Sequence, residues 1–544
     1  MQIKYWKNLQ SPIDGMQKIS AMCYSPDSRK LAVATADRVV QLYDENGEKR
    51  DRFGTRPAEK GQKSYVVRSM WFSQDSTKLA IAQSDNAIFV YKLGTEWKER
   101  KAICNKFIQS SSVTCMTWPY DRPNEIYFGV AEGKVRVGTL KNNKSSSVYA
   151  TESYVVSISA SPDGQNIVSG HLDGAIITMN IDTKAKQKLT THPSVPYALA
   201  WGVQILAAGN DGRVVFYEAD GNCFQRVDYS KDDKVKEFTS AMFNPTGETA
   251  IVGNFNRFYV YNYNSKRPQW DEICCKNIEN YYSVTSLSWK YDSSKICFGS
   301  LCGSIDIFDI CRKKNTYKGK FEFTYVSASQ VIVQSIEAGT KKMVLKSDVG
   351  AEISKVNVYQ DRFLVGNTHD TILLGDMETA KSSEILWRGS GNEKFIFSNP
   401  NVCMIFNAGE LSIVEYGVNE IIGTCRTDHL HPNMISARLN YSQKGEYAGE
   451  ENVTKVIAYL LDTQTVYVQD LNNQQILAQI NHDTKIDFLE LNPGGNRLLF
   501  RDRRKQLYLY NILEQTKSTL LNFCTYVNWV PFSDVVVAQN RTNL

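Results

Sequence analysis

The sequence predicts an all-β protein built from two β-propellers in tandem. Within the first 310 residues, one pattern of short alternating strands and tight polar turns recurs seven times. The residues that end the first strand of each copy are 41 to 48 positions apart: Tyr24, Phe72, Trp118, Ala160, Trp201, Phe243 and Trp289. Four short strands in each repeat of about 40–45 residues are typical of a propeller blade. An aromatic content of 11% also favours strands, which accommodate flat side chains well.

The length of the chain requires more than one domain. A chain of 544 residues is too long to fold around one hydrophobic core. The seven clear repeats end near residue 310, and a looser version of the same rhythm follows them. We therefore predict a first seven-bladed propeller over residues 1–315 and a second propeller over 316–544.

Each repeat of the first half has a recognisable start and two characteristic turns. The predicted innermost strands begin at Ile19, Val67, Val113, Val155, Pro196, Phe238 and Val284. Turns such as 25–28 and 161–164 place Pro, Asp and Gly where a type I turn prefers them. A second turn carries Asp-Asn or Asp-Gly, for example at 173–174, as two-residue hairpins require.

The N-terminal segment is expected to close the first propeller. Residues 2–9 form an isolated strand-like run before the first repeat. The last repeat, 284–309, lacks its outermost strand, so the N-terminal run is the candidate for that place. Such closure would leave no exposed sheet edge, which is a general aggregation hazard.

The second half is predicted to contain six or seven blades. Its opening unit starts at Phe321, and the following innermost strands are expected at 353–358, 394–398, 434–440, 485–492 and 524–530. The polar insertion 440–454 is expected to be an exposed loop. The sequence stops at Leu544 where a third strand should begin, so we expect a truncated last blade and a fragment of a longer protein.

Composition excludes several classes of protein. A net charge of +5 is small for this length and does not indicate a dedicated nucleic-acid binder. The first residues lack the apolar core of a signal peptide, and no apolar run is long enough to span a bilayer. The twelve cysteines form no C-x-x-C pair, which predicts buried thiols in a reducing, intracellular compartment and no zinc site.

Motifs for catalysis and cofactor binding do not assemble. The Gly-x-Ser-x-Gly elbow of hydrolases is absent. The run 129–135 superficially suggests a phosphate loop, but it aligns with the hairpin of every other repeat. His171 and His192 are interpreted as surface or network residues, and the cysteines between 297 and 311 as two strands and a turn. We therefore expect that the protein is not an enzyme and that it has no catalytic residue, no cofactor and no metal.

A protein-interaction face is the remaining candidate site. In three repeats a basic residue directly follows the second turn, and in the first repeat a basic residue lies within that turn. Tyrosines precede three of the innermost strands. The candidate contact residues are Arg38, Tyr65, Lys134, Tyr154, Arg213, Arg257 and Tyr282. Equivalent positions in neighbouring blades lie on one face, and exposed Tyr near Arg is common in interface hot spots. A plain solvated rim, with the tyrosines packed in the core, is the alternative.

These repeats resemble the WD-repeat family. The Trp-Asp ending of that family is replaced here by Tyr43-Asp44, Tyr91 or Phe308-Asp309, and the Gly-His element of its buried Asp-His-Ser-Trp network is mostly missing. Over nearly its whole length the chain also looks like the N-terminal part of the largest subunit of intraflagellar transport complex B. The matching stretches are 37–53, 63–92, 103–115, 143–157, 192–201, 300–309, 320–333, 391–417 and 521–544. The stretches 118–125 and 440–454 depart from the family.

This resemblance implies a non-enzymatic scaffold that moves cargo along the ciliary axoneme and is needed to assemble and maintain cilia. It implies a tandem propeller head followed, in the full-length protein, by a solenoid of TPR-like repeats. Expected partners are other complex B subunits, including one with a calponin-homology domain, with a possible peripheral contact to anionic membrane and no nucleic acid. The expected location is the cilium or flagellum and the basal body, on the cytoplasmic side. A coatomer-like vesicle-coat subunit and an anionic-membrane or nucleic-acid binding module are the alternatives.

Overall fold

The computed structural model describes residues 1–12, 18–59, 61, 64–94, 96–279, 281–337, 341–439, 455–531 and 533–540. These residues form two compact units, Met1–Ile336 and Glu337–Leu544. Almost all regular structure is antiparallel sheet, and the one helix among the described residues is the short 3-10 helix η1 (Pro432–Met434). The all-β fold class is therefore confirmed. The domain boundary between residues 315 and 316 stays a prediction.

Seven four-stranded sheets make up the first propeller, and each runs from an innermost to an outermost strand. The first sheet contains β2 (Ile19–Tyr24), β3 (Leu31–Thr35), β4 (Val39–Tyr43) and β5 (Lys49–Gly54). The second contains β6 (Val67–Phe72), β7 (Lys78–Gln83), β8 (Ala87–Lys92) and β9 (Ala102–Ile108). The third contains β10 (Val113–Thr117), β11 (Glu125–Val130), β12 (Lys134–Thr139) and β13 (Lys144–Ala150). The fourth contains β14 (Val155–Ala160), β15 (Asn166–His171), β16 (Ala175–Asn180) and β17 (Lys186–Thr191).

Three further sheets complete this propeller. The fifth contains β18 (Ala198–Trp201), β19 (Ile205–Ala208), β20 (Arg213–Tyr217) and β21 (Cys223–Asp228). The sixth contains β22 (Ser240–Phe243), β23 (Thr249–Gly253), β24 (Arg257–Asn264) and β25 (Gln269–Asn277). The seventh contains β26 (Val284–Trp289), β27 (Lys295–Ser300), β28 (Ile305–Cys311) and β1 (Gln2–Gln10). Five of the innermost strands begin at the predicted residue; β18 and β22 begin two residues later than predicted.

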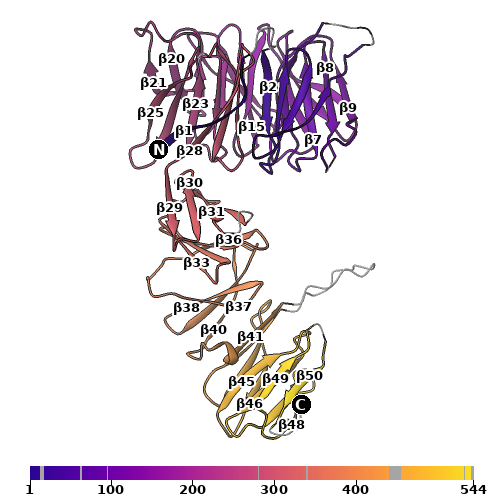
Figure 1. The fold of residues 1–544 in the computed structure, drawn as a ribbon, viewed down its shortest axis with the longest axis vertical. Coiled ribbons are helices and arrows are strands. Elements are labelled where there is room, and N and C mark those ends of the chain that lie inside the picture. The colour runs from indigo at the N-terminus through magenta and orange to yellow at the C-terminus, as the bar shows by residue number, and fades with distance from the viewer. Residues whose placement is uncertain are drawn as a thin grey trace. The chain divides into compact units, whose positions relative to one another are not determined.

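The N-terminal strand pairs with the last repeat of the first propeller, as the sequence indicated. β1 is antiparallel to β28, with Ile3 opposite Ile310 and Tyr5 opposite Phe308. Figure 1 labels the two strands side by side next to the N-terminus. The Lys295 ammonium also lies 3.6 Å from the centre of the Trp6 ring, a close cation–π contact. The first repeat thus has its own four strands, and the seventh is completed by residues from the other end of the domain.

The innermost strands adjoin one another in a closed cycle. Each contacts the next along the chain from β2 to β26, and β26 in turn contacts β2. The Tyr24 N–H donates to the Ser288 hydroxyl at 2.9 Å, and the Thr285 hydroxyl donates to the Ile19 carbonyl at 2.7 Å. These strands surround a cavity of about 440 Å³.

The hydrophobic core lies between neighbouring sheets. Ile19 and Val33 of the first sheet pack with Cys297 and Ile305 of the seventh in one buried cluster. Similar clusters join the first sheet to the second and the sixth sheet to the seventh. Because each sheet needs a neighbour to bury its apolar face, stability depends on completing the ring.

The rest of the chain continues with sheets of the same type. The eighth sheet contains β29 (Lys313–Tyr317), β30 (Phe321–Tyr325), β31 (Gln330–Ser335) and β32 (Lys342–Lys346). The ninth contains β33 (Lys355–Tyr359), β34 (Phe363–Asn367), β35 (Thr371–Asp376) and β36 (Lys381–Leu386). The tenth contains β37 (Lys394–Asn399), β38 (Val402–Asn407), β39 (Glu410–Glu415) and β40 (Ile421–Arg426).

The remaining sheets reach the end of the described chain. The eleventh contains β41 (Ile435–Leu439), β42 (Lys455–Leu460), β43 (Thr465–Asp470) and β44 (Ile476–Asn481). The twelfth contains β45 (Ile486–Leu491), β46 (Arg497–Asp502), β47 (Leu507–Asn511) and β48 (Thr516–Leu521), and the last contains β49 (Tyr526–Trp529) and β50 (Val536–Gln539). Each innermost strand predicted for this half overlaps a strand of the structure. The insertion 440–454, predicted as a loop, lies outside the described residues.

Candidate interaction surface

One edge of the first propeller is formed by the second turn of each blade and by the connection to the next blade. We call this edge the connector face; its turns are 36–38, 84–86, 131–133, 172–174, 209–212, 254–256 and 301–304. The connections are hydrogen-bonded to these turns in a repeating way. Thr55 N–H donates to the Arg38 carbonyl at 2.9 Å, and Tyr229 N–H donates to the Gly212 carbonyl at 2.8 Å. The seven predicted contact residues lie in or beside these turns and connections.

The four predicted basic residues, Arg38, Lys134, Arg213 and Arg257, are half-buried and contact nearby polar groups. Lys134 Nζ lies 2.8 Å from a Glu132 carboxylate oxygen, and Arg213 Nε lies 3.0 Å from Asp228. Arg257 Nε donates to the Asn256 side chain at 3.2 Å. The predicted basic residues thus lie in or beside turns of the connector face, and acidic neighbours offset part of the positive charge of Lys134 and Arg213. A shared basic arc that contacts a partner stays a prediction.

The three tyrosines differ in exposure. Tyr65 is only 7% exposed; its hydroxyl donates to the Thr55 carbonyl at 2.9 Å, and the Arg38 guanidinium lies 5.2 Å from the centre of its ring. For Tyr65 the prediction of an exposed contact is wrong, because the connection from residue 55 and the Arg38 side chain cover it. Tyr154 and Tyr282 are 38% and 56% exposed, so they do reach the surface.

Several surface residues of the connector face escaped the sequence analysis. Leu172 and Leu301 occupy equivalent turn positions and are both exposed. Their N–H groups donate to the carbonyls of Tyr154 and Tyr282, so each leucine lies beside an exposed tyrosine. Phe255 contacts Tyr282 edge to face at 4.7 Å between ring centres. The sequence offered one signal that could have identified Phe255 as a surface residue: it is a bulky apolar residue within a tight turn.

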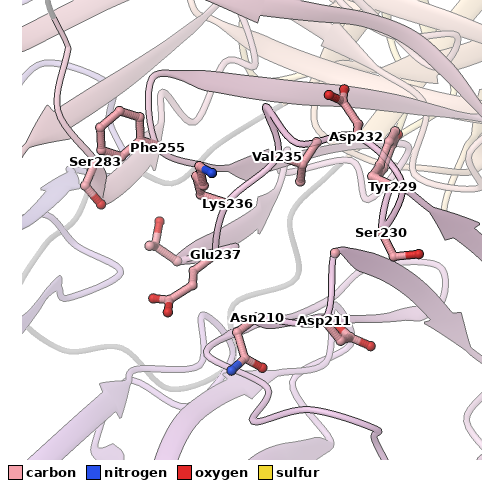
Figure 2. Close-up of a pocket in the computed structure, with 12 residues that line it drawn as sticks. Asn210, Asp211, Tyr229, Ser230, Asp232, Val235, Lys236, Glu237, Phe255 and Ser283 are labelled. Atoms are coloured by element: carbon pink, nitrogen blue, oxygen red, sulfur yellow. The ribbon is translucent and has the colours of Figure 1, made fainter.

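A pocket of about 600 Å³ opens on the connector face at the fifth and sixth blades. Figure 2 shows Phe255 and Ser283 on one side and Tyr229, Ser230 and Asp232 on the other, with Lys236 and Glu237 between them. The remaining lining residues are Asn210, Asp211, Gly212, Val235 and Thr239. Three of the lining side chains are acidic and one is basic.

The segment that carries Lys236 and Glu237 is held by a buried side chain. Asn254 is fully buried, and its amide donates to the Lys236 carbonyl at 2.7 Å and accepts from the Lys236 N–H at 3.0 Å. The same amide donates to the Glu237 carbonyl at 3.1 Å. On the other side, Phe238 N–H donates to the Gly209 carbonyl at 2.9 Å. The backbone below the pocket is therefore fixed while both charged side chains remain exposed.

The close approach of two backbones shapes one wall of this pocket. Gly212 has a positive φ of 69°, and a Cβ atom there would lie 3.0 Å from the Ser230 Cα. Only glycine adopts this conformation readily and leaves room for the neighbouring chain. Asp211 precedes this glycine, and its Oδ1 accepts from the Ser194 hydroxyl at 2.9 Å. Its Oδ2 is buried, has no hydrogen bond, and lies 3.9 Å from Arg213 Nη1.

A second hollow of about 780 Å³ lies on the connector face at the third and fourth blades. Tyr154 and Leu172 line it, together with Glu152, Asp173 and Lys188. Partial burial acts to raise the pKa of Asp173, but hydrogen bonds from Ala175 N–H and from the Ser153 side chain outweigh it, so the pKa is lowered. The connector face thus has two hollows, each with apolar and acidic lining.

His171 belongs to a buried hydrogen-bond network beneath this second hollow. It is fully buried, with Nδ1 3.2 Å from the Ser153 carbonyl and Nε2 2.9 Å from the Ser169 hydroxyl, which also bonds to Tyr149. These partners place the proton on Nδ1. Burial lowers the pKa of His171, so the ring is neutral. The prediction that His171 belongs to a hydrogen-bond network is therefore confirmed, and the alternative prediction that it lies on the surface is wrong.

His192 is also a buried network residue. It is 2% exposed, and its Nδ1 lies 2.9 Å from the Tyr217 hydroxyl. Burial is the main cause that lowers its pKa. The surface interpretation is wrong for this residue as well.

Other sequence interpretations can be compared with the described residues. The run 129–135 is the end of β11, a turn and the start of β12, and residues 297–311 are two strands and a turn, as predicted. All twelve cysteines are free thiols, and six of them are buried. Cys104, Cys223 and Cys275 are exposed, contrary to the expectation of burial, because they lie on outermost strands.

Within the described ranges, no group of three His, Cys, Asp or Glu side chains is arranged to hold a metal ion. No helix in the described part of the chain has the length and apolarity to cross a membrane.

A family model described as "WD domain, G-beta repeat" matches residues 7–44 and 142–177. The first match starts within β1 and continues through the inner strands of the first sheet; the second starts just before β13 and continues into the fourth sheet. Each matched repeat therefore joins the outermost strand of one blade to the inner strands of the next. This arrangement explains why β1 completes the seventh blade.

Relatives match along the whole chain. "Intraflagellar transport protein 172" of Chlamydomonas reinhardtii is 50% identical over 556 residues, and the homolog of Danio rerio is 52% identical over 553 residues. The homolog of Homo sapiens is 48% identical over 553 residues. Each match covers 100% of this chain and 31% of the relative, so the chain spans about a third of the length of these relatives. The chain belongs to the intraflagellar transport protein 172 family and corresponds to the N-terminal WD-repeat head of its members.

Proposed function

We propose that this chain is a protein-interaction scaffold of intraflagellar transport complex B, which moves cargo along the axoneme and is required to assemble and maintain cilia. The observation that carries the proposal is the identity of about half of all residues with intraflagellar transport proteins over the full chain.

The connector face supports a scaffold in preference to an enzyme. It presents exposed Tyr154, Leu172, Tyr282 and Leu301 around two hollows whose walls are held by repeated backbone hydrogen bonds. Exposed aromatic and aliphatic side chains on a rigid edge are the usual anchors of protein interfaces. We propose this face, with Arg38, Lys134, Arg213 and Arg257 at its turns and Tyr65 beneath Arg38, as the partner-binding surface of a non-enzymatic protein.

Other complex B subunits are the proposed partners, including one with a calponin-homology domain, and anionic membrane is a proposed peripheral contact. The proposed location is the cilium or flagellum and the basal body, on the cytoplasmic side. Both proposals rest on the family, whose members are named intraflagellar transport proteins.

A chimera in Chlamydomonas reinhardtii tests the proposed function. The matching part of the algal relative is replaced by this chain and tagged with a fluorescent protein in a strain that lacks the endogenous gene. We expect flagella to form and the fluorescent chimera to move along them. Affinity purification should recover other complex B subunits.

Two control strains make the chimera experiment decisive. Untransformed cells define the baseline, and cells that receive the intact algal gene define full rescue. A stable chimera that restores no flagella would contradict the proposal, and so would a chimera confined to Golgi membranes, which would favour the vesicle-coat alternative.

A further inference from the structure

We infer that the turn between β46 and β47 in the twelfth sheet binds an acidic segment of a partner polypeptide. We call residues 503–506 the basic turn, because they include Arg503, Arg504 and Lys505. The inference rests on the proposed scaffold function only in taking the ligand to be a polypeptide. It adds an interaction surface in the unit Glu337–Leu544 and the chemistry of the partner at that surface.

A buried carboxylate fixes the backbone of the basic turn. Asp502 is 1% exposed; its Oδ1 accepts from the Gln506 N–H at 2.9 Å, and its Oδ2 accepts from the Thr484 hydroxyl at 2.7 Å. Lys505 N–H donates to the Asp502 carbonyl at 2.9 Å. The turn is therefore ordered before a ligand binds, and a fixed site loses little conformational entropy on binding.

Hydrogen bonds bring two neighbouring segments beside the basic turn. Arg503 N–H donates to the Lys485 carbonyl at 2.8 Å, and Cys524 N–H donates to the Lys505 carbonyl at 2.7 Å. Phe523 precedes Cys524, so its backbone also lies next to the turn. The three basic side chains of the turn, Lys485 and Phe523 are all exposed. Four cations and one aromatic ring thus share this part of the surface.

Most of the positive charge of this surface is not neutralised. Asp487 binds two cations, with Arg501 Nε 2.8 Å from Oδ1 and Lys505 Nζ 2.5 Å from Oδ2. The other three cations of this surface form no ion pair within the part of the chain that the structure describes: Lys485, Arg503 and Arg504. Asp483 is the one exposed acidic residue in 482–487 and 501–506. The remaining positive charge attracts a ligand that carries carboxylates.

An exposed aromatic ring adds an apolar contact to this charge. Phe523 is 59% exposed, and its φ of 58° lies in the left-handed region, which bulky residues rarely adopt. The next residue, Cys524, is fully buried, so the backbone turns at this point and leaves the ring at the surface. Exposed aromatic and arginine side chains are the usual anchors of protein interfaces, and a guanidinium donates two parallel hydrogen bonds to a carboxylate. An acidic segment with one apolar side chain can use both kinds of contact.

The extent of the surface favours a polypeptide over nucleic acid or membrane. Nucleic acids and anionic membranes contact many cations over a broad area. Here three unpaired cations gather at one turn, and the net charge of the whole chain is only +5. A short acidic segment matches that extent.

Binding of capped fluorescent pentapeptides to the purified 544-residue chain tests this inference. The acidic leucine peptide has leucine at the centre and glutamate at every other position. One control replaces each glutamate by glutamine, and another replaces the leucine by serine. In fluorescence anisotropy, we expect the acidic leucine peptide to bind at least about tenfold more tightly than the glutamine control, with an affinity that falls as salt rises. The serine control should bind more weakly than the leucine peptide.

Matched variants locate the binding. Arg503→Gln with Arg504→Gln removes two charges from the basic turn and should weaken the acidic leucine peptide about tenfold or more. Lys266→Gln with Arg267→Gln removes two adjacent charges from the exposed turn between β24 and β25 and should leave affinity unchanged. Phe523→Ala should abolish the preference for leucine over serine. Thermal melting must show that each variant folds.

Two further probes test the other classes of ligand: a single-stranded thymidine oligonucleotide, and vesicles of phosphatidylcholine and phosphatidylserine. Binding of either probe that is tighter than that of the acidic leucine peptide, and is lost in the Arg503 and Arg504 double variant, would overturn the assignment to a polypeptide.

Four other outcomes would overturn the inference: no binding of the acidic leucine peptide, equal binding of the glutamine control, equal loss in the two double variants, or an unchanged leucine preference in Phe523→Ala. Because these measurements use purified protein, their failure is separate from a failure of the chimera to restore flagella.

Discussion

The Glu248 carboxylate in the sixth blade accepts hydrogen bonds from the Ser329 hydroxyl at 3.0 Å and from the Ala328 N–H at 3.1 Å. Both partners belong to the turn between β30 and β31, and Ser329 is 2% exposed. The neighbouring Gln330 side chain donates to the Asp292 carbonyl of the seventh blade at 3.2 Å. The β30–β31 hairpin is therefore attached to the first propeller by a buried polar contact.

The first prediction concerns this contact. Glu248→Ala leaves the part-buried Ala328 N–H without its acceptor and the Ser329 hydroxyl with only the Ser327 hydroxyl, 3.3 Å away. The loss of an acceptor costs a buried donor about 1–3 kcal/mol. Faster cleavage within residues 313–336 is the expected result, measured by limited proteolysis and mass spectrometry. Glu45→Ala, an exposed turn residue of the first blade, is the control. Equal cleavage of the Glu248 variant and the unchanged chain would show that the hairpin is held by other contacts.

A second prediction concerns the N-terminal strand. Deletion of residues 1–10 exposes the edge of β28 and removes the Trp6 ring from Lys295. We expect a lower melting temperature and concentration-dependent aggregation, because an unpaired strand edge can pair with another chain. Light scattering and calorimetry would check this.

A synthetic peptide of residues 1–10 provides the control for the deletion. Added in trans, it should restore the melting temperature in part, whereas a scrambled peptide should not. A truncated chain that remains monomeric with an unchanged melting temperature would contradict the closing role of β1.

The third prediction is a pH dependence of stability. The pKa values of buried His171 and His192 are lowered below their ordinary value of 6.5. The unfolded chain therefore binds more protons than the folded chain once the pH falls below about 6.5. Stability from these residues is complete above that pH and is lost as the pH decreases, by up to about 1.4 kcal/mol per pH unit for each group.

Calorimetry between pH 7.5 and 5.5 would measure this dependence. His171→Gln should reduce the slope, because glutamine does not titrate in this range. His369→Gln changes a histidine whose side chain is 94% exposed and should leave the slope unchanged. Identical slopes in all three proteins would show that His171 does not contribute.

The fourth prediction concerns packing in the sixth blade. Trp270 is 2% exposed, stacks on Phe216 at 4.8 Å, and donates from Nε1 to the Gln204 side chain at 2.9 Å. Trp270→Ala leaves a cavity and removes a donor, so the free energy of unfolding should fall by about 3–5 kcal/mol. Tyr120→Ala, at a residue that is 50% exposed, should change it by no more than about 0.5 kcal/mol. Urea unfolding followed by circular dichroism would compare the two; similar losses would argue against a packed core around Trp270.

Periodicity predicted the strands well, because alternation and turn residues are local properties of the sequence. Ile19, Val67 and Val284 each begin an innermost strand where the pattern indicated. Burial of Tyr65 was not predictable in this way, since it depends on Arg38 and on the connection from residue 55, which only the folded chain brings together.

The pocket was missed for a related reason. Its charged residues come from one turn, 209–212, and from the connection that follows β21. Asn254, which holds Lys236, is 18 positions away along the chain. No local pattern marks such an arrangement. The repeat alignment correctly placed Arg213 and Arg257 at equivalent turns, but it could not show that Asp228 lies beside Arg213.

The pairing of β1 with β28 also affects how the protein is synthesised. Residues 1–10 leave the ribosome long before their partner strand, which ends at Cys311. At about 5–20 residues per second, roughly 15–60 s pass before β28 has been made. During this interval the nascent chain carries an amphipathic segment without its partner, and chaperones have time to bind it. Slow translation or a bulky N-terminal fusion would thus reduce the yield of folded protein more than the stability of the finished ring suggests.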